Sequence, residues 1–468
     1  MKYFAPAALL PEGWTRNVVL DIDSRGFISA ISSDASPTGD ASRTAAESLA
    51  GPVVPAMPNL HSHAFQRALA GRTGHTAPDR DDSFWSWRQA MYDFVDRVDP
   101  DAFEAITAQA YVEMAKAGYS AVAEFHYVHQ DRSGQPYDDP AEVAWRIVAA
   151  AETAGIGLTL LPVFYAHAGF GGAPPSAGQR RFVHSVHSFA RLFERLGERA
   201  DVLAYALGIA PHSLRAVMPA ELLEIRRLAG PATPIHIHAA EQTKEVDDCV
   251  AWSGMRPVEW LLNHASVDAR WCLVHATHMT ESEVAALAAS RAVAGLAPTT
   301  EADLGDGTFP GPAYLAADGR FGVGSDSNTI ISPFAELRQL EWSQRTRLRR
   351  RNVLAGTDNQ TIATTLWTRA ARGGAQAVAQ PLGAIEAGRR ADLCVLNDDD
   401  PALAGQLPDE LLDAATFGPA RMPVRDMMIK GRWVVREGRH SREDEVFERY
   451  RGALARMGRG VLPTAGRM

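Results

Sequence analysis

The sequence predicts an α/β protein in which a (β/α)8 barrel is joined to a small β-sandwich domain built from both chain ends. Two observations favour this fold. The middle of the 468-residue chain contains eight short apolar runs separated by longer amphipathic segments, and both ends carry short β-prone runs bounded by turn residues. Repeated strand–helix alternation is typical of a parallel sheet, and eight units suit a closed barrel.

The β-domain is expected to combine residues 1–55 with residues 386–440. The first range contains the runs NVVLDID and GFISAIS, and the second contains ADLCVLN, RDMMIKG and RWVVREG. Apolar or alternating runs between Gly, Asp and Arg indicate strands. Chain termini often lie close together, so both ends can share one domain. We expect residues 441–468 to form a C-terminal helical tail.

The barrel is expected to span residues 56–385. Its candidate strands are residues 55–63, 120–127, 157–166, 202–212, 234–241, 271–277, 292–298 and 320–327. Intervening segments such as DAFEAITAQAYVEMAKAG place apolar residues at helical spacing and end in glycine. An open doubly wound sheet is the alternative, but the sequence lacks the Gly-rich dinucleotide fingerprint that would favour it.

Composition excludes several classes of protein. A formal net charge of -9 argues against a partner that is a nucleic acid or an anionic membrane. The cysteines, Cys249, Cys272 and Cys394, are too few and odd in number for a disulfide framework, which favours a reducing compartment. We find neither a signal peptide nor an apolar run of membrane-spanning length, so a soluble cytoplasmic protein is expected.

Histidines at the ends of candidate strands indicate a metal site. His61 and His63 form an HxH pair at the end of the first strand, where residues i and i+2 point to the same side. Taken alone, this pair is weak evidence, because two polar residues at the start of a loop would look the same. The later strands strengthen the interpretation.

Three further strands also deliver polar side chains at their tips. His236 and His238 share one side of the fifth strand, Glu241 follows three residues later, His275 ends the sixth strand and Asp326 ends the eighth. Barrel enzymes build their active sites at this end of the strands. His238 lies at the tip and is the better ligand candidate, whereas His236 lies deeper and is expected to be a core or supporting histidine.

The pattern of HxH, HxxE, His and Asp on strands one, five, six and eight resembles the amidohydrolase superfamily. The segment GAIEAGRRADLCVLN before the C-terminal strands is also similar. Within the superfamily, MPNLHSHAFQRA, FWSWR, HIHAAEQTKEVDDC and TTEADLGDG resemble the formimidoylglutamate deiminases. Those enzymes convert N-formimino-L-glutamate and water to N-formyl-L-glutamate and ammonia in histidine degradation. The resemblance covers nearly the whole chain.

The resemblance implies a role for each matching residue. The implied metal ligands are His61, His63, His238 and Asp326, and the implied catalytic residues are Glu241, His275 and Asp326. The implied substrate-binding residues are Gln66, Arg88, Tyr127, His212 and Arg215. A homodimer is also implied. Asn328 stands where the family pattern leads us to expect histidine, so details of substrate binding could differ there.

The chemistry requires residues of these types. A divalent metal ion held by three histidines and an aspartate lowers the pKa of bound water from 15.7 towards about 7. Asp326 could accept a proton from that water, and Glu241 could carry one to the imine nitrogen. His275 could stabilise the tetrahedral intermediate. The alternative for Glu241 is a carboxylate at the start of a helix.

One metal ion is expected rather than two. Superfamily members with two metals commonly use a carboxylated lysine from strand four, and the run VLAYALGIAPHS contains no lysine. Three histidines and a carboxylate suit zinc best, with iron as the alternative.

A small dicarboxylate substrate requires local positive charge. Arginine binds carboxylates in bidentate fashion, Arg215 lies just past strand four, and Arg88 lies in an aromatic-rich loop that could fold over the site. One rival function is deamination of a purine, pyrimidine or triazine ring, which would favour aromatic and amide contacts over arginines. The other is an inactive metal-binding relative, which retention of Glu241 and all the ligands argues against.

Overall fold

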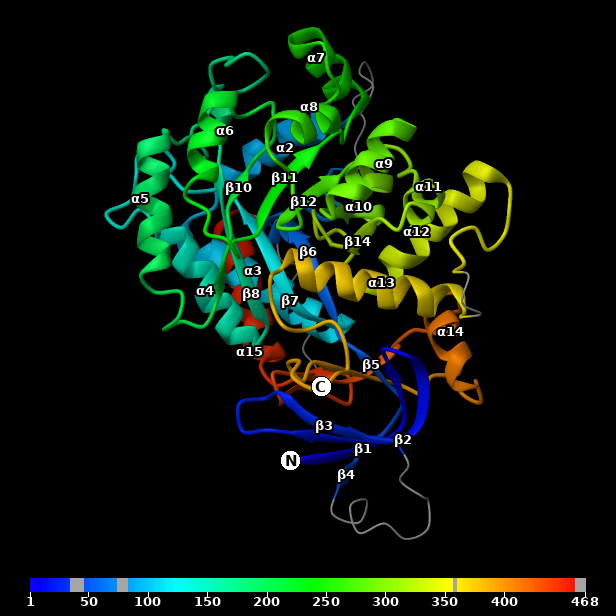
Figure 1. Cartoon of the computed structure of the whole chain (residues 1–468). Helices are drawn as coiled ribbons and strands as arrows, with labels where there is room; N and C mark the ends of the chain where they lie inside the picture. The colour runs from blue at the N-terminus through cyan, green and yellow to red at the C-terminus, as the bar shows by residue number, and fades with distance from the viewer. Residues whose placement is uncertain (34–45, 74–82, 357–359, 459–468) are drawn as a thin grey trace.

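A (β/α)8 barrel and a β-domain built from both chain ends make up the computed structural model, which describes residues 1–33, 46–73, 83–356 and 360–458 (Figure 1). The predicted fold class is therefore confirmed. The barrel strands are β6 (Met57–Ser62), β7 (Tyr119–His126), β8 (Gly157–Phe164), β9 (Ala206–Leu207), β10 (Ala210–Pro211), β11 (Ile235–Ala239), β12 (Trp271–His275), β13 (Val293–Leu296) and β14 (Arg320–Val323).

The barrel consists of two parallel sheets that meet at two seams. One sheet has the order β10-β8-β7-β6 with β9 beside β8, and the other has the order β11-β12-β13-β14. The bridges Ile209↔Ile235 and Ser213↔His238 close one seam, and the bridge Ser62↔Asp326 closes the other. Residues expected at the metal site therefore lie directly on both seams.

The fourth barrel strand differs from its prediction. We expected one strand over residues 202–212, but the structure has two short pieces, β9 and β10, on either side of Gly208. A Cβ atom at Gly208 would lie 2.4 Å from Leu161 Cδ2 and 2.9 Å from the Pro234 carbonyl oxygen. The chain at Gly208 is thus wedged between its two neighbouring strands, and only glycine fits there.

Helices connect the barrel strands, and their ends follow local sequence signals. Asp99 caps α3 by accepting a hydrogen bond from the Ala102 amide, and the helix ends at Gly118 with φ 109°. The α-helices around the barrel are α2 (Phe84–Val95), α3 (Pro100–Ala117), α4 (Glu142–Ala154), α5 (Val186–Gly197), α6 (Pro219–Arg226), α7 (Thr243–Ser253), α8 (Pro257–His264), α9 (Glu281–Ser290), α10 (Pro298–Leu304), α11 (Gly311–Ala316), α12 (Pro333–Leu348) and α13 (Ile362–Ala377). The short 3-10 helices are η1 (Ala64–Leu69), η2 (Ala177–Gln179) and η3 (Pro408–Glu410).

The strands of the β-domain are hydrogen-bonded into one sheet. Its order is β18-β17-β16-β15-β5-β1-β2-β3, with β4 beside β1. The strands are β1 (Lys2–Leu10), β2 (Gly13–Ile22), β3 (Ile28–Ser32), β4 (Glu47–Ser48), β5 (Val53–Pro55), β15 (Leu393–Leu396), β16 (Val424–Ile429), β17 (Arg432–Arg436) and β18 (Arg439–His440). The antiparallel pair of β5 and β15 joins the N-terminal strands to the C-terminal ones, as the shared-domain prediction requires.

Helices complete the C-terminal part of the chain. α14 (Leu411–Phe417) precedes β16, and α15 (Glu443–Arg456) ends the described chain. Residues 459–468 of the predicted helical tail, and residues 34–45 of the predicted β-domain, lie outside the described residues.

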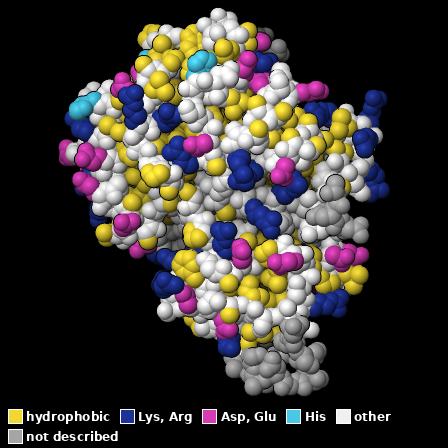
Figure 2. Space-filling model, in the orientation of Figure 1, with side chains coloured by type: hydrophobic (Ala, Val, Ile, Leu, Met, Phe, Trp, Pro, Cys, Tyr) yellow, Lys and Arg dark blue, Asp and Glu magenta, His cyan; other side chains and the backbone are white. Residues whose placement is uncertain are grey.

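The face drawn in Figure 2 is mixed in charge, with basic and acidic side chains interspersed and few histidines visible. His61, His63, His238 and His275 are buried. The three cysteines are buried and free. Within the described residues, no helix is both long and apolar enough to cross a membrane.

A buried ion pair ties the β-domain to the barrel. Arg390 Nε donates to Asp392 Oδ1 at 2.8 Å, and Arg390 Nη1 donates to Gln380 Oε1 at 2.6 Å. Asp392 Oδ1 also accepts a hydrogen bond from the Lys430 amide at 2.8 Å. The Trp367 indole on α13, which crosses between the two parts, donates to the Pro55 carbonyl.

Replacing Asp392 with alanine should destabilise this junction. The substitution would leave the Arg390 charge buried without its partner, a loss that typically costs about 3–5 kcal/mol. A lower midpoint of thermal unfolding would report it. Asp398→Ala, at an exposed position six residues away, should stay within about 0.5 kcal/mol of the parent. Equal midpoints for both variants would contradict this description of the junction.

Candidate active site

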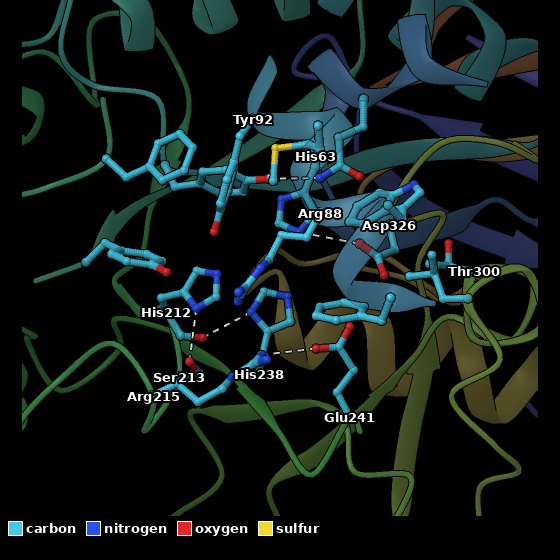
Figure 3. A pocket seen from close by; sticks show the side chains of 18 of the residues that line it. His63, Arg88, Tyr92, His212, Ser213, Arg215, His238, Glu241, Thr300 and Asp326 are labelled. Atoms are coloured by element: carbon cyan, nitrogen blue, oxygen red, sulfur yellow. Dashed lines mark hydrogen bonds and ion pairs between the residues drawn. The ribbon is translucent and has the colours of Figure 1, made fainter. Parts of the chain in front are cut away.

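One buried pocket at the C-terminal ends of the barrel strands collects the residues that the sequence predicted (Figure 3). Its lining includes ten of them: His63, Gln66, Arg88, Tyr127, His212, Arg215, His238, Glu241, His275 and Asp326. The remaining one, His61, is fully buried directly behind the lining. All the predicted site residues are thus brought together.

Four of these residues point donor atoms at one another. His238 Nε2 lies 3.1 Å from His61 Nε2, and Asp326 Oδ1 lies 3.5 Å from His61 Nε2 and 3.4 Å from His63 Nε2. One nitrogen from each of His61, His63 and His238 lies within 4.8 Å of the other two. Tetrahedral ligands at zinc–nitrogen distances of about 2.0–2.1 Å stand about 3.3 Å apart, so these side chains fit one metal ion.

The histidine rings are oriented by hydrogen bonds behind them. His63 Nδ1 lies 3.0 Å from the Phe125 carbonyl oxygen, and His238 Nδ1 lies 3.0 Å from the His212 carbonyl oxygen. Donation from each Nδ1–H fixes the tautomer and leaves the Nε2 lone pair facing the site. Burial lowers the pKa of His61 to about 3 and holds the pKa of His238 well below its usual value, so both rings are neutral, as metal ligands must be.

Asp326 is held by the backbone where the last strand meets the first. The Asp326 amide donates to the His61 carbonyl at 3.0 Å, and the His63 amide donates to the Asp326 carbonyl at 2.9 Å. Burial opposes ionisation of the carboxyl group, but hydrogen bonding with His61 and the positive charge of His275 hold the pKa of Asp326 well below its usual range. The site therefore presents a carboxylate beside three neutral imidazoles.

His275 has carboxylates on both sides. Its Nδ1 lies 3.3 Å from Glu301 Oε1, while its Nε2 lies 3.7 Å from Glu241 Oε1 and 3.8 Å from Asp326 Oδ2. Burial favours the neutral ring, but Glu241, Glu301 and Asp326 together raise the pKa of His275 to about 10. His275 Nε2 is buried without a hydrogen-bond partner among the described atoms, and it faces the space between Glu241 and Asp326.

Left-handed backbone occurs at several residues around these side chains. Ala240, His275, Ala276, Asp326 and Asn328 all have positive φ, between 43° and 67°. Left-handed conformations at non-glycine residues cost of order 1–3 kcal/mol each and persist where the surrounding structure enforces them. Here they turn the chain sharply at the strand ends and direct the side chains into the pocket.

Glu241 lies in the loop between β11 and α7. The alternative role, a helix-start carboxylate, belongs instead to Glu245, which accepts hydrogen bonds from the Ala240 and Glu241 amides at 3.2 and 3.1 Å. Glu241 Oε2 accepts a hydrogen bond from Arg215 Nη2 at 3.1 Å, drawn in Figure 3. The Glu241 side chain therefore faces the pocket, where Arg215 occupies one of its oxygens.

The other side of the pocket is polar and cationic. Gln66 Nε2 donates to the Tyr127 hydroxyl at 2.8 Å, and His212 lies beside Ser213. Arg88 reaches into the pocket with its guanidinium 4.4 Å from the Trp85 ring, and no described carboxylate pairs with it. The prediction that Arg88 lies in a loop was wrong. Arg88 lies on α2, because Ser83 caps a helix that the aromatic residues continue.

Sequence reasoning missed several residues of the site. Phe84, Trp87, Met91 and Tyr92 line the pocket from the same face of α2 as Arg88, at spacings of three, four, seven and eight residues that a helical interpretation would have revealed. Tyr165, at the end of the third strand, and Glu301, in the TTEADLGDG motif, could have been found by the strand-end argument and by proximity to His275.

His236 and Asn328 have structural roles. His236 is fully buried, and its Nε2 lies 2.9 Å from the Ala377 carbonyl oxygen below the pocket, which confirms the core interpretation. Asn328 does not line the pocket. Its Nδ2 donates to Ser62 Oγ and to the Asp326 carbonyl, and its Oδ1 accepts from Ser325 Oγ, so it braces the turn that carries Asp326.

Comparisons of the sequence with known families and proteins identify its relatives. The family model described as "Amidohydrolase family" matches residues 53–434, and that described as "Formimidoylglutamate deiminase HutF, N-terminal domain" matches residues 3–45. A formimidoylglutamate deiminase from Pseudomonas aeruginosa is 53% identical over 94% of this chain and 96% of its own length. A 5-methylthioadenosine/S-adenosylhomocysteine deaminase from Natronomonas pharaonis is 27% identical over 82% of this chain and 81% of its own.

Solved structures share the fold. An amidohydrolase from Brucella melitensis has a TM-score of 0.90 and 44% identity, over 97% of this chain and 99% of its own. An adenosine deaminase from Xanthomonas campestris, solved with bound zinc, has a TM-score of 0.78 and 21% identity over 98% of each chain. The second likeness shows the fold alone.

Metal binding should separate two histidines of the same strand. His238→Gln removes an atom of the donor cluster and should weaken binding of Zn²⁺ at least about 100-fold, because even substitutions behind ligands cost 10–100-fold. His236→Gln, two residues earlier and outside the cluster, should retain the parent affinity. Titration against a chelator of known affinity measures both. Equal weakening in the two variants would contradict the proposed donor set.

Proposed function

The chain belongs to the amidohydrolase family, and within it we infer a formimidoylglutamate deiminase that hydrolyses N-formimino-L-glutamate to N-formyl-L-glutamate and ammonia. The observation that carries this conclusion is the pairing, in one pocket, of a His and Asp donor cluster with two arginines. The donor cluster suits hydrolysis at carbon, and the arginines suit a substrate with two carboxylates. The protein is thus a hydrolase acting on the carbon–nitrogen bond of a linear amidine.

We propose that His61, His63, His238 and Asp326 hold one divalent ion, with zinc as the preferred metal and iron as the alternative. The separations of their donor atoms and the neutral state of the histidines support zinc. Such an ion supplies Lewis acidity that makes water nucleophilic at neutral pH.

The proton transfers are assigned to Glu241 and Asp326. As a new carbon–oxygen bond forms at the formimino carbon, Asp326 accepts one proton from the attacking water. Glu241 takes the second proton of that water, from the hydroxyl group of the tetrahedral adduct, and delivers it to the terminal nitrogen. The carbon–nitrogen bond breaks, and ammonia leaves with the proton that Asp326 had accepted. His275 Nε2, between the two carboxylates, donates a hydrogen bond to the oxygen that gains negative charge.

Substrate binding is assigned to the cationic and polar side of the pocket. Arg88 and Arg215, which enter from opposite sides in Figure 3, are proposed to bind the two carboxylates. Gln66, Tyr127 and His212 would complete the polar contacts. A purine, pyrimidine or triazine substrate would bring no carboxylate to either arginine, so ring deamination is not favoured.

We also propose a homodimer in the cytoplasm, on the resemblance to the formimidoylglutamate deiminases. Light scattering of the purified protein should give the mass of two chains, and the mass of a single chain would contradict the proposal.

Ammonia release should single out one substrate. The metal-loaded protein should act rapidly on N-formimino-L-glutamate, and more slowly on N-formimino-L-aspartate, because the shorter chain cannot reach both arginines in the same pose. Amino-purines and amino-pyrimidines should release nothing. A coupled ammonia assay follows all of them. Release from a ring compound alone would overturn the substrate assignment and keep only the hydrolytic chemistry.

Replacing Glu241 with glutamine should leave metal content unchanged and reduce kcat by roughly 10²–10⁴, the usual contribution of a general acid–base group. The exposed Glu224→Gln, in α6, should keep the parent kcat. Steady-state kinetics with metal analysis of both proteins provides the comparison. Undiminished turnover by Glu241→Gln would remove Glu241 from the proton transfers.

A further inference from the structure

Arg215 is already engaged before any substrate is bound. Its Nη2 donates to Glu241 Oε2 at 3.1 Å and lies 3.9 Å from Glu245 Oε2. The exposed fractions of the three side chains are only 12%, 7% and 0%, so little water screens these charges. Arg215 Nε is buried without a hydrogen-bond partner among the described residues. The guanidinium therefore has two carboxylate neighbours and an unused buried donor at Nε.

The proposed function gives both partners of this ion pair another task. Arg215 has to bind a carboxylate of the substrate, and Glu241 has to exchange protons with the formimino group. While Arg215 Nη2 is bonded to Glu241 Oε2, the guanidinium stabilises the negative charge of Glu241 and occupies one of its oxygens. The ion pair between Arg215 and Glu241 must therefore open during each turnover, or Arg215 must bind Glu241 and the substrate carboxylate together.

Glu245 is placed to retain Arg215 when the pair opens. Its carboxylate accepts hydrogen bonds from the Ala240 and Glu241 amides, it is on the first turn of α7, and it does not line the pocket. Glu245 therefore stays fixed while Glu241 moves. A substrate carboxylate entering beside Arg215 competes with Glu241 for the donors of one guanidinium, which frees Glu241 Oε2 from its hydrogen bond.

We propose, on the basis of the proposed function, that Arg215 exchanges Glu241 for a carboxylate of the substrate, so that recognition of the carboxylate releases Glu241 for proton transfer. Arg215 then determines specificity through turnover as well as through binding. If Arg215 only bound the substrate, a substrate that lacks the carboxylate would have a higher KM and an unchanged kcat. An amidine without carboxylates leaves Arg215 on Glu241 and is turned over slowly even when saturating.

A substrate supplied in two pieces tests the exchange in the unaltered enzyme. The metal-loaded protein is assayed with saturating N-propylformamidine, which has the amidine but no carboxylate, and sodium acetate is added at constant ionic strength with chloride as the balancing anion. Acetate should fill the carboxylate position beside Arg215 and raise kcat saturably, by roughly tenfold. No change, or inhibition only, would overturn the exchange.

Variants provide a second, independent measurement. Arg215→Gln frees Glu241 permanently, so its kcat on N-propylformamidine should exceed that of the parent and lose its response to acetate, while its kcat/KM on N-formimino-L-glutamate falls. The exposed Arg227→Gln should match the parent in every assay. A kcat on N-propylformamidine equal to or below that of the parent contradicts the proposal. If the parent does not act on N-formimino-L-glutamate, the proposed function itself is wrong, which is a separate outcome.

Discussion

Everything at the active site depends on how the barrel is closed. At one seam, the Asp326 amide donates a hydrogen bond to the His61 carbonyl, and the Asp326 carbonyl accepts one from the His63 amide. At the other seam, the His238 amide donates a hydrogen bond to the His212 carbonyl. The same backbone contacts that join the two sheets therefore fix the positions of all four proposed ligands. The ends of strands carry these donor atoms, and this brings three imidazoles and a carboxylate close together. The distances from His61 Nε2 to His238 Nε2, and from Asp326 Oδ1 to His61 Nε2 and His63 Nε2, are 3.1–3.5 Å. Without a cation between them, the lone pairs of these buried donor atoms would repel one another and would lack solvation.

The two halves of the pocket solve different problems. The side formed by β6, β11, β12 and β14 concentrates ionisable groups whose states are set by burial and by one another, with neutral ligand histidines, an ionised Asp326 and a His275 that favours the charged form. The side formed by α2 and the loop after β10 contributes Arg88, Arg215 and aromatic rings. In a chain of net charge -9, these half-buried arginines supply the local positive charge that the proposed dicarboxylate substrate requires. The Arg215–Glu241 contact joins the two halves and is the basis of the proposed coupling between substrate binding and proton transfer.

Much of this could be predicted from the sequence because strand ends follow a simple rule. Apolar runs that finish in His61, His63, His238, His275 and Asp326 had to bring those residues to one face of any parallel barrel. Three features could not be predicted. The break of strand four at Gly208 depends on contacts with Leu161 and Pro234, which are remote in sequence. Helix α2 was not predicted, because its closely spaced aromatic residues were interpreted as a loop over the site. The bracing role of Asn328 depends on a left-handed backbone and on Ser62, 266 residues away.

In the proposed reaction, water attacks the formimino carbon and the terminal carbon–nitrogen bond breaks. Running the reaction on N-formimino-L-glutamate in ¹⁸O-labelled water, with analysis of the products by mass spectrometry, shows which bond is broken. We expect N-formyl-L-glutamate with one labelled oxygen in the formyl group and one equivalent of ammonia. Formation of L-glutamate and formamide instead would mean that the other carbon–nitrogen bond is cleaved, and it would contradict the assignment of Glu241 as proton donor to the terminal nitrogen.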